Sequence, residues 1–196
     1  MDTRGYFEHT FIYLKRFMDL SRSDFDLIIP LLELRTYDKK TYVVEQGEVD
    51  NYLNIVLKGL VRKYVKAPKG EVTIQLATEG HLVQSEISFH KRIPSDVILE
   101  TLESTVLVSV HHDNIEYALK NMPGAEALGR SIVTQMFIKK DNRYVGQLNI
   151  TTRERFLQYM NNHPHMLQRV PQKILASYLN IKPETFSRLK HLVKKK

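Results

Sequence analysis

The sequence contains no cysteine, and this absence excludes several kinds of site. Without thiols the chain cannot form a disulfide. Thiolate-held zinc sites and iron–sulfur clusters are excluded as well, because both use cysteine sulfur as a ligand. We therefore expect no iron–sulfur cluster, and the residues present assign no cofactor with certainty.

Long apolar runs are also missing. No stretch of 18 apolar residues occurs, so we expect no membrane-spanning helix. The N-terminal residues are interrupted by charges and lack the pattern of a secretory signal. With 42% hydrophobic and 26% charged residues, the composition is typical of a soluble globular protein. We expect a cytoplasmic location and no membrane partner.

The motifs of common enzymes are lacking too. The sequence has no Gly-x-Ser-x-Gly, P-loop or Gly-x-Gly-x-x-Gly motif. Histidines cluster at 111–112 and 163–165, but adjacent histidines at a strand end cannot easily face one ion, and no carboxylate accompanies them at metalloenzyme spacing. The ligand pattern of a cupin enzyme is absent from 42–110. We therefore predict no catalytic residue, no metal site and no enzyme activity.

Acidic residues are scarce at one end of the chain. From Gln168 to Lys196, eight Lys or Arg residues stand against one acid, Glu184, and this segment carries the whole net charge of +7. The first 167 residues are therefore neutral overall. A basic end on a neutral body favours a polyanionic partner, although a solvated basic tail would give the same count.

The N-terminal part predicts helices followed by a β domain. Helices are expected over 6–19 and 23–33, and Ser21 with Asp24 has capping-box spacing for the second. After this, short β-rich runs are separated by turn residues as far as residue 110. Such runs at intervals of about 8–12 residues predict an all-β sandwich or barrel-like domain. A hairpin turn is predicted at 67–71.

Helical spacing returns after the β domain. Asp113 and Glu116 form another capping-box pattern, and a long helix is predicted from about 125 to 145. A break at 146–150 is predicted to act as a hinge, and Thr151 with Glu154 caps the next helix.

The long helix has two stripes that could make contacts. The first, which we predict to be a dimer interface, consists of Leu128, Ile132, Gln135, Ile138, Asn142 and Val145. The second and weaker stripe consists of Val133, Phe137, Lys140 and Tyr144. Two usable faces favour packing on the chain's own domain and on a second copy. The alternative is that the helix simply lies on the β domain.

Residues 172–192 predict two short helices that cross. Their apolar positions can form a shared core, namely Leu175, Leu179, Ile181, Phe186 and Leu189. Ala176 is small where the second helix must approach closely. Asn180 stands at the turn, where a positive φ is needed, and Pro183 fits the first turn of the second helix. Lys182 is a poor N-cap. The pattern predicts a helix-turn-helix.

The polar face of the second helix has the chemistry of base recognition. Glu184, Ser187 and Arg188 lie at spacings that place them on one side. Arg can pair with guanine and Glu can accept from the cytosine amino group, whereas a face built only for phosphate has no use for an acid. We predict that these three residues read DNA bases. The alternative is a solvated helix with a weak Glu184–Arg188 pair.

The segment RVPQKILASYLNIKPETFSRLK (169–190) resembles the DNA-binding end of the cyclic-AMP receptor protein/fumarate-nitrate regulator (Crp/Fnr) family of transcription regulators, in the branch common in Bacteroidetes. Its Glu-x-x-Ser-Arg signature stands here as the three residues named above. By this analogy, we expect further contacts with the DNA backbone from Gln172, Lys173, Thr185, Lys190 and His191.

This resemblance covers nearly the whole chain and implies an α+β fold. The implied parts are a cyclic-nucleotide-binding-like β-roll with N-terminal helices (1–122), a long dimerisation helix (123–147) and a C-terminal winged helix-turn-helix (148–196).

The effector pocket departs from the family pattern. Nucleotide-binding members carry a phosphate cassette in which an Arg binds the cyclic phosphate and a Glu binds the ribose. The matching stretch here is GHLVQSEISFHKRIPSDVIL (80–99), in which Gly80, Glu86 and Ser95 are the candidate pocket residues. Asp96 follows directly and no Arg flanks it, so a cyclic phosphate would face a carboxylate without an Arg fork. We predict that cAMP is not bound in the usual way and that the effector is unknown.

Together these features predict a homodimeric, sequence-specific DNA-binding transcription regulator. Its predicted partners are double-stranded DNA with a pseudo-palindromic operator, a second copy of the chain and, as a further candidate, RNA polymerase. The alternative is a small-molecule-binding signalling module whose helix-turn-helix serves protein contacts. The operator sequence and the direction of regulation do not follow from the sequence.

Overall fold

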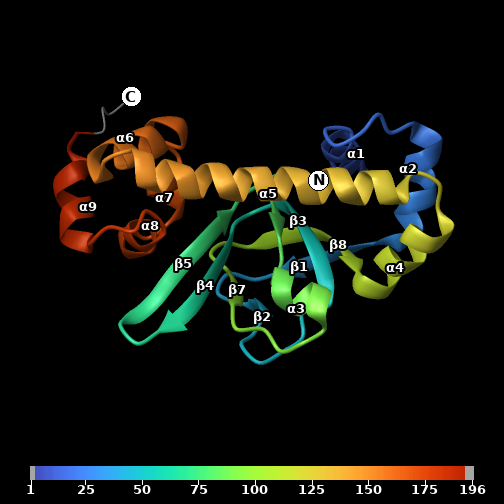
Figure 1. Cartoon of the computed structure of the whole chain (residues 1–196), viewed down its shortest axis with the longest axis horizontal. Helices are drawn as coiled ribbons and strands as arrows, with labels where there is room; N and C mark the ends of the chain where they lie inside the picture. Colours follow the sequence, from blue (N-terminus) through green and yellow to red (C-terminus); the bar gives the residue numbers. More distant parts are fainter. Residues whose placement is uncertain (1–2, 193–196) are drawn as a thin grey trace.

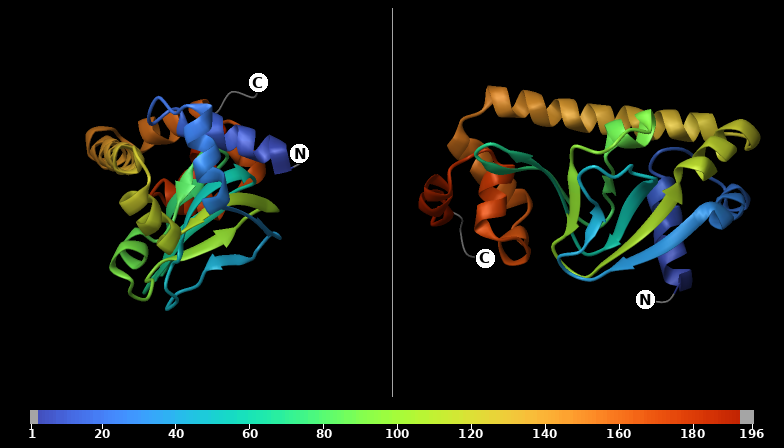
Figure 2. Two further views of the ribbon diagram at one scale, coloured as in Figure 1. Left: turned by 90° about the vertical axis from the view of Figure 1, so that its right-hand side faces the viewer. Right: turned by 90° about the horizontal axis from the view of Figure 1, so that it is seen from below.

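The computed structural model describes residues 3–192. N-terminal helices, a β-roll, one long helix and a group of C-terminal helices follow one another along the chain (Figure 1). The long helix runs the length of the molecule, from the N-terminal helices at one end to the C-terminal helices at the other. In two further views it lies along one side of the roll (Figure 2).

Two short helices and a 3-10 helix precede the roll. They are α1 (Thr3–Leu14), α2 (Arg22–Ile28) and η1 (Ile29–Leu31). The predicted capping box is confirmed, because Ser21 Oγ accepts from the Asp24 N–H and the Asp24 carboxylate accepts from the Ser21 N–H. The helices predicted over 6–19 and 23–33 are both too long. The second is cut short because Pro30 lies in η1 and a strand begins directly after it.

The roll consists of two four-stranded antiparallel sheets, ordered β1-β8-β3-β6 and β2-β7-β4-β5. The strands are β1 (Leu32–Tyr37), β2 (Tyr42–Val44), β3 (Tyr52–Lys58), β4 (Val61–Ala67), β5 (Gly70–Ala77), β6 (Leu82–Val83), β7 (Ile98–Thr101) and β8 (Thr105–His111). One buried core is aliphatic and takes residues from both sheets: Val44, Val56, Val61, Ala77, Val83, Leu99 and Leu107. The predicted all-β domain and its hairpin turn are confirmed.

One short helix, α3 (Glu86–Lys91), lies between β6 and β7 along the chain, and the sequence did not predict it. Its start carries Glu86 from the candidate pocket, and it ends at Arg92 in the left-handed region, with φ 55°. In the turn between β3 and β4, Gly59 has φ 94°, and a Cβ there would lie 2.6 Å from the Ser104 carbonyl oxygen. The β3–β4 turn and the β7–β8 turn, which contains Ser104, can approach so closely only because Gly59 has no side chain.

The helix after the roll, α4 (His112–Asn121), starts differently from the prediction. Its N-cap is His111, whose Nδ1 accepts from the Asp113 N–H at 3.2 Å. The predicted capping box of Asp113 with Glu116 is therefore wrong. Because β8 continues to His111, the imidazole is in position to cap the helix, and Asp113 already lies within its first turn.

The long helix is α5 (Ala125–Asn149), which starts after Gly124 with φ 79°. Its first half lies on the N-terminal helices, because Ser131 Oγ donates to the Phe17 carbonyl at 2.6 Å and Ile132 packs in the same core. The break predicted at 146–150 is wrong for most of its length. Gly146 remains helical, at the modest cost of a glycine in a helix, and the chain leaves helical geometry at Ile150.

Four helices complete the described chain: α6 (Thr152–Asn162), α7 (Met166–Arg169), α8 (Gln172–Tyr178) and α9 (Pro183–Lys190). The capping box of Thr151 with Glu154 is confirmed. The predicted wing is not found, because residues 112–192 contain no strand and α7 occupies the connection between α6 and α8. Met166 and Val170, at the two ends of this connection, are buried in the same core as Phe156 of α6 and Leu175 of α8.

The C-terminal helices do not form a separate core. Their buried side chains belong to one cluster that also takes Leu60, Leu76 and Leu102 from the roll. Within residues 3–192, no helix has the length and apolar character needed to cross a membrane.

Candidate functional site

Helices α8 and α9 are joined by the tight turn that the sequence predicts. Asn180 has φ 54°, and the Ile181 N–H donates to the Ala176 carbonyl at 3.0 Å. Pro183 opens α9, and Lys182 precedes it without a side-chain cap. Phe186 is fully buried, with its ring 5.1 Å from the ring of Phe156 of α6. The apolar side of α9 is therefore anchored in the core, which fixes where its other side points.

The predicted base-reading residues lie together on the outer side of α9. Glu184, Ser187 and Arg188 are exposed. Within residues 3–192 none of them makes a hydrogen bond or ion pair, and the alternative pairing of Glu184 with Arg188 is not formed. A carboxylate, a hydroxyl and a guanidinium thus face solvent from a helix whose opposite side is buried. A ligand that binds these groups has to displace only the water bound to them.

The residues expected to contact the DNA backbone surround this face unevenly. Gln172 and Lys173 are exposed in the first turn of α8, while Lys190 and His191 are exposed at the end of α9. Thr185 is half-buried. Four of the five are therefore open to solvent, on the two helices that the turn holds together.

The predicted dimer stripe of α5 splits between two environments. Ile132 packs against the N-terminal helices, Leu128 is half-buried, and the Gln135 amide donates to the Arg16 carbonyl at 3.4 Å. Further along, Ile138, Asn142 and Val145 are exposed. The first half of the stripe is thus used within the chain.

The second stripe of α5 is the more exposed of the two. Val133, Phe137, Tyr144 and Leu148 are 56%, 69%, 63% and 68% exposed. Leu148 extends the stripe beyond the residues that the sequence analysis singled out. An exposed apolar row of this length is typical of a surface that contacts another protein.

The candidate pocket residue Glu86 is already engaged by two lysines. One carboxylate oxygen pairs with Lys63 of β4, and the other lies 2.8 Å from Lys140 of α5. The Lys63 side chain is only 5% exposed, and its ammonium also donates to the Gln84 carbonyl at 2.8 Å. An ion pair therefore occupies the place where the family resemblance puts a ribose-binding Glu.

The charges in this cluster shift each other's protonation. Burial alone would raise the pKa of Glu86, but the ammonium groups of Lys63 and Lys140 hold it below its usual range. Burial lowers the pKa of Lys63, and the Glu86 carboxylate opposes that change. The carboxylate is therefore ionised at neutral pH and is balanced from both sides.

The other two pocket candidates have separate partners. Ser95 is buried, and its hydroxyl donates to Ser85 Oγ and to the Val97 carbonyl at 2.8 and 2.7 Å. Gly80 stands in the turn before β6, where its N–H donates to the Val56 carbonyl. The nearest arginine, Arg92, donates to the Asp50 and Phe89 carbonyls and to the Asn51 side chain. The Arg92 guanidinium is therefore already engaged by Asp50, Asn51 and Phe89.

Three basic residues have roles in the site that the sequence did not predict. They are Lys63, Lys140 and Arg169. A signal existed for the first, because Arg62 and Lys63 stand next to each other in a predicted strand, so that one of them must point into the roll, and both are buried. A lysine that alternation points into a core implies a carboxylate partner. No such signal marked Lys140 or Arg169, since helices present basic residues to solvent routinely.

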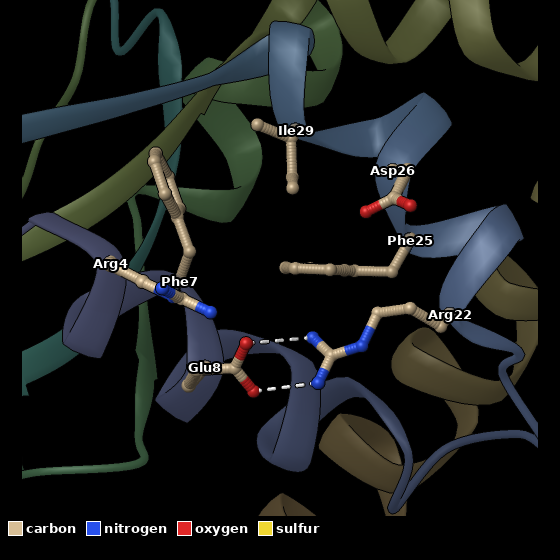
Figure 3. Close-up of a pocket in the computed structure, with 7 residues that line it drawn as sticks. All are labelled: Arg4, Phe7, Glu8, Arg22, Phe25, Asp26 and Ile29. Carbon is tan, nitrogen blue, oxygen red and sulfur yellow. Dashed lines mark hydrogen bonds and ion pairs between the residues drawn. The ribbon is translucent and has the colours of Figure 1, made fainter.

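Two surface clefts lie away from these residues. One is lined by Phe7 and Phe25 and closed by Arg22, whose guanidinium makes two hydrogen bonds to the Glu8 carboxylate at 2.8 and 2.9 Å (Figure 3). The other lies by β1 and the loop before β3, where Arg35 stacks over the Tyr52 ring at 4.0 Å. Neither cleft is lined by a predicted site residue.

Residues 34–122 match the family model of the cyclic nucleotide-binding domain. No curated protein sequence matches the chain.

Among solved structures, the chain is similar to the c-di-GMP responsive global regulator CLP of Xanthomonas campestris, with 16% identity over 88% of this chain and 91% of that chain and a TM-score of 0.65. It is also similar to the catabolite activator protein of Thermus thermophilus (19%, 92% and 85%, TM-score 0.57). A third similar structure is FixK2 of Bradyrhizobium japonicum (19%, 82% and 83%, TM-score 0.62).

At these identities the solved structures support only a similar fold, and the family model applies only to the roll. Residues 34–122 thus resemble a cyclic nucleotide-binding domain, and the chain as a whole has a fold similar to those of CLP, the catabolite activator protein and FixK2.

Proposed function

We propose that the protein is a homodimeric, sequence-specific DNA-binding transcription regulator. The observation that carries this proposal is the outer side of α9, where Glu184, Ser187 and Arg188 are exposed and unpaired within the described chain. The buried Phe186 holds the helix in place. An anchored helix with free donors and acceptors on its other side suits the edges of bases in a major groove. The helix-turn-helix is then the reading element.

The exposed part of α5 supports the proposed dimer. The apolar row from Val133 to Leu148, together with Ile138 and Val145, is the proposed contact between two copies. Parallel pairing of two long helices along this row would place the two copies of α9 at the same end of the assembly. They can then read half-sites one helical turn apart, about 34 Å, on a pseudo-palindromic operator.

The roll is proposed to act without cAMP in its usual mode. A ribose hydroxyl would compete with Lys63 and Lys140 for Glu86, and a cyclic phosphate would meet Asp96 with no arginine beside it. The similar regulator from Xanthomonas is described as responsive to c-di-GMP, so an effector of another kind is compatible with this fold. RNA polymerase remains a proposed partner that would contact the assembly on DNA.

Selection of bound sites from random DNA tests the main proposal. We expect enrichment of a two-fold symmetric motif, and affinity for it that falls steeply with salt, because several phosphates are neutralised on binding. A flat dependence on salt, or no enriched sequence, would favour the signalling module whose helix-turn-helix serves protein contacts. Titration with cAMP tests the second part, since binding at micromolar concentration would contradict the proposed closed pocket.

A further inference from the structure

The strongest polar contact between the roll and the C-terminal helices converges on Arg169, the last residue of α7. Its Nε donates to Glu103 at 2.9 Å, and its two terminal nitrogens donate to Glu79 at 2.8 and 2.9 Å. One of these nitrogens also reaches the Gly59 carbonyl at 3.0 Å and the second Glu103 oxygen at 2.9 Å. A single guanidinium thus joins three separate turns of the roll.

The charges at this junction are held tightly. The Arg169 side chain is 22% exposed and Glu103 is 29% exposed, so water screens them only in part. The side-chain hydrogen bonds to Glu103 and Glu79 raise the pKa of Arg169, and although burial alone would raise the pKa of Glu79, Arg169 holds it below its usual range. Charge-assisted forks of this kind fix orientation as well as distance.

A second set of contacts also holds the C-terminal helices on the roll, and it involves α8, β5 and α5. Ser177 of α8 accepts from the Thr73 N–H of β5 at 2.9 Å. Arg143 of α5 stacks over the Tyr178 ring at 3.9 Å and donates to the carbonyls of Tyr178 and Ile74. The roll, α5 and α8 therefore meet in one interface. Its apolar part is the shared core of Leu60, Leu76 and Leu102 with the C-terminal helices.

We propose that Arg169 is a positioning residue that locks the C-terminal helices to the roll in the orientation that presents α9. Regulation by a loose hinge after α5 would need the C-terminal helices to move as a unit. This interface opposes such motion, because Arg169 and the shared apolar core hold the C-terminal helices on the roll. In the locked orientation, α9 lies at the far end of the molecule from the N-terminal helices, with its polar side in solvent (Figure 1). The lock therefore favours the DNA-binding arrangement, a part of the proposal that rests on the DNA-binding function proposed above.

The absence of cysteine allows a direct test of the lock. Spin labels are attached to Lys39→Cys on the roll and Asn161→Cys on α6, both of which are exposed. Labelled protein is diluted with unlabelled protein, so that a dimer carries at most one labelled subunit. Pulsed dipolar spectroscopy should then give one narrow distance distribution for the otherwise unchanged protein.

Arg169→Ala should broaden this distribution, and Arg169→Lys should broaden it less, because an ammonium keeps the charge but cannot fork. Glu103→Gln removes one partner with little change of volume and should act in the same direction, which keeps the test open if Arg169→Ala folds poorly. Arg153→Ala is the matched control, because Arg153 is exposed on the neighbouring helix α6 and its side chain makes no hydrogen bond or ion pair with residues 3–192. A distribution as narrow in Arg169→Ala as in Arg153→Ala would overturn the lock.

DNA affinity tests the functional half separately. We expect Arg169→Ala to bind the selected operator at least tenfold more weakly, while the control changes much less. If the distribution broadens but operator affinity is unchanged or rises, the locked arrangement is not the DNA-binding one, and that half is overturned. If the parent protein binds no DNA, the proposed function fails, and the distance measurements still decide whether Arg169 locks the two parts together.

Discussion

The outer side of α9 and the interior of the roll carry similar polar side chains and hold them in opposite ways. On α9, Glu184 and Arg188 are exposed and leave each other unpaired. In the roll, Glu86 is shared between Lys63 and Lys140. An exposed group exchanges water for a ligand at little cost, whereas the half-buried Glu86 carboxylate must first give up its ion pairs. The proposed reading end of the molecule is therefore open to a partner, and the proposed effector pocket is closed by the chain's own residues.

The largest effect is expected from breaking the closed end. Glu86→Leu leaves the buried Lys63 ammonium without its carboxylate and should lower the free energy of unfolding by about 3–4 kcal/mol. The double variant Lys63→Met/Glu86→Leu removes both charges and should recover most of that loss. Urea unfolding of the single and double variants measures this directly. Additive losses in the double variant would show that the pair is not the reason for the effect.

A second effect on the roll concerns acid. Burial, with Lys139 and His163 nearby, lowers the pKa of His81 to about 4, and its Nδ1 accepts from the Thr78 N–H. Because the unfolded chain binds this proton near pH 6.5 and the folded chain only near pH 4, stability is highest above pH 6.5 and falls as the pH drops through this window. The loss approaches about 3 kcal/mol at pH 4.

His81→Asn keeps a polar side chain in this turn and removes the titrating group. Its unfolding free energy should change less between pH 6.5 and 4.5 than that of the parent protein. His163, whose pKa is also lowered by burial, is the same in both proteins and cancels in the difference. Parallel curves would mean that His81 does not titrate in this window.

At the open end, Arg188→Ala should weaken operator binding by about 1–3 kcal/mol and relax the preference at one base pair. Stability should hardly change, because the side chain is exposed and unpaired within the described chain. Fluorescence anisotropy on the selected operator and on random DNA separates the two roles of an arginine. Equal losses on both DNAs would assign Arg188 to phosphate rather than to bases.

The two ends also differ in how far the sequence predicted them. The α8–α9 turn follows from local rules, since Asn180 at positive φ, Pro183 in the first turn and a buried Phe186 all act within 20 residues of one another. The closed pocket joins Lys63, Glu86 and Lys140, which are far apart along the chain, so no local pattern could show it.

The same reason explains the errors in the fold. The helix predicted over 23–33 extends into the first two residues of β1, because the spacing of Ile28, Ile29 and Leu32 is helical. The identity of β1 as a strand is set by pairing with β8, which is distant in sequence. The start of α4 was misplaced for a similar reason, since β8 sets where His111 lies. Local patterns located most elements, and long-range pairing decided where these two begin.

The smallest effect sharpens the comparison at the entry to α9. Lys182 has the extended geometry of an N-cap but makes no side-chain cap. Lys182→Ser should accept from a free backbone N–H of the first turn and raise the unfolding free energy by about 0.5–1 kcal/mol. If Lys182 serves DNA instead of stability, operator and random DNA should both bind more weakly, and the slope of log affinity against log salt should fall by about one. Lys69→Ser, in the exposed β4–β5 turn, is the control for loss of one charge. If the variant is more stable and binds DNA as well as the parent protein does, Lys182 does not contribute to DNA binding.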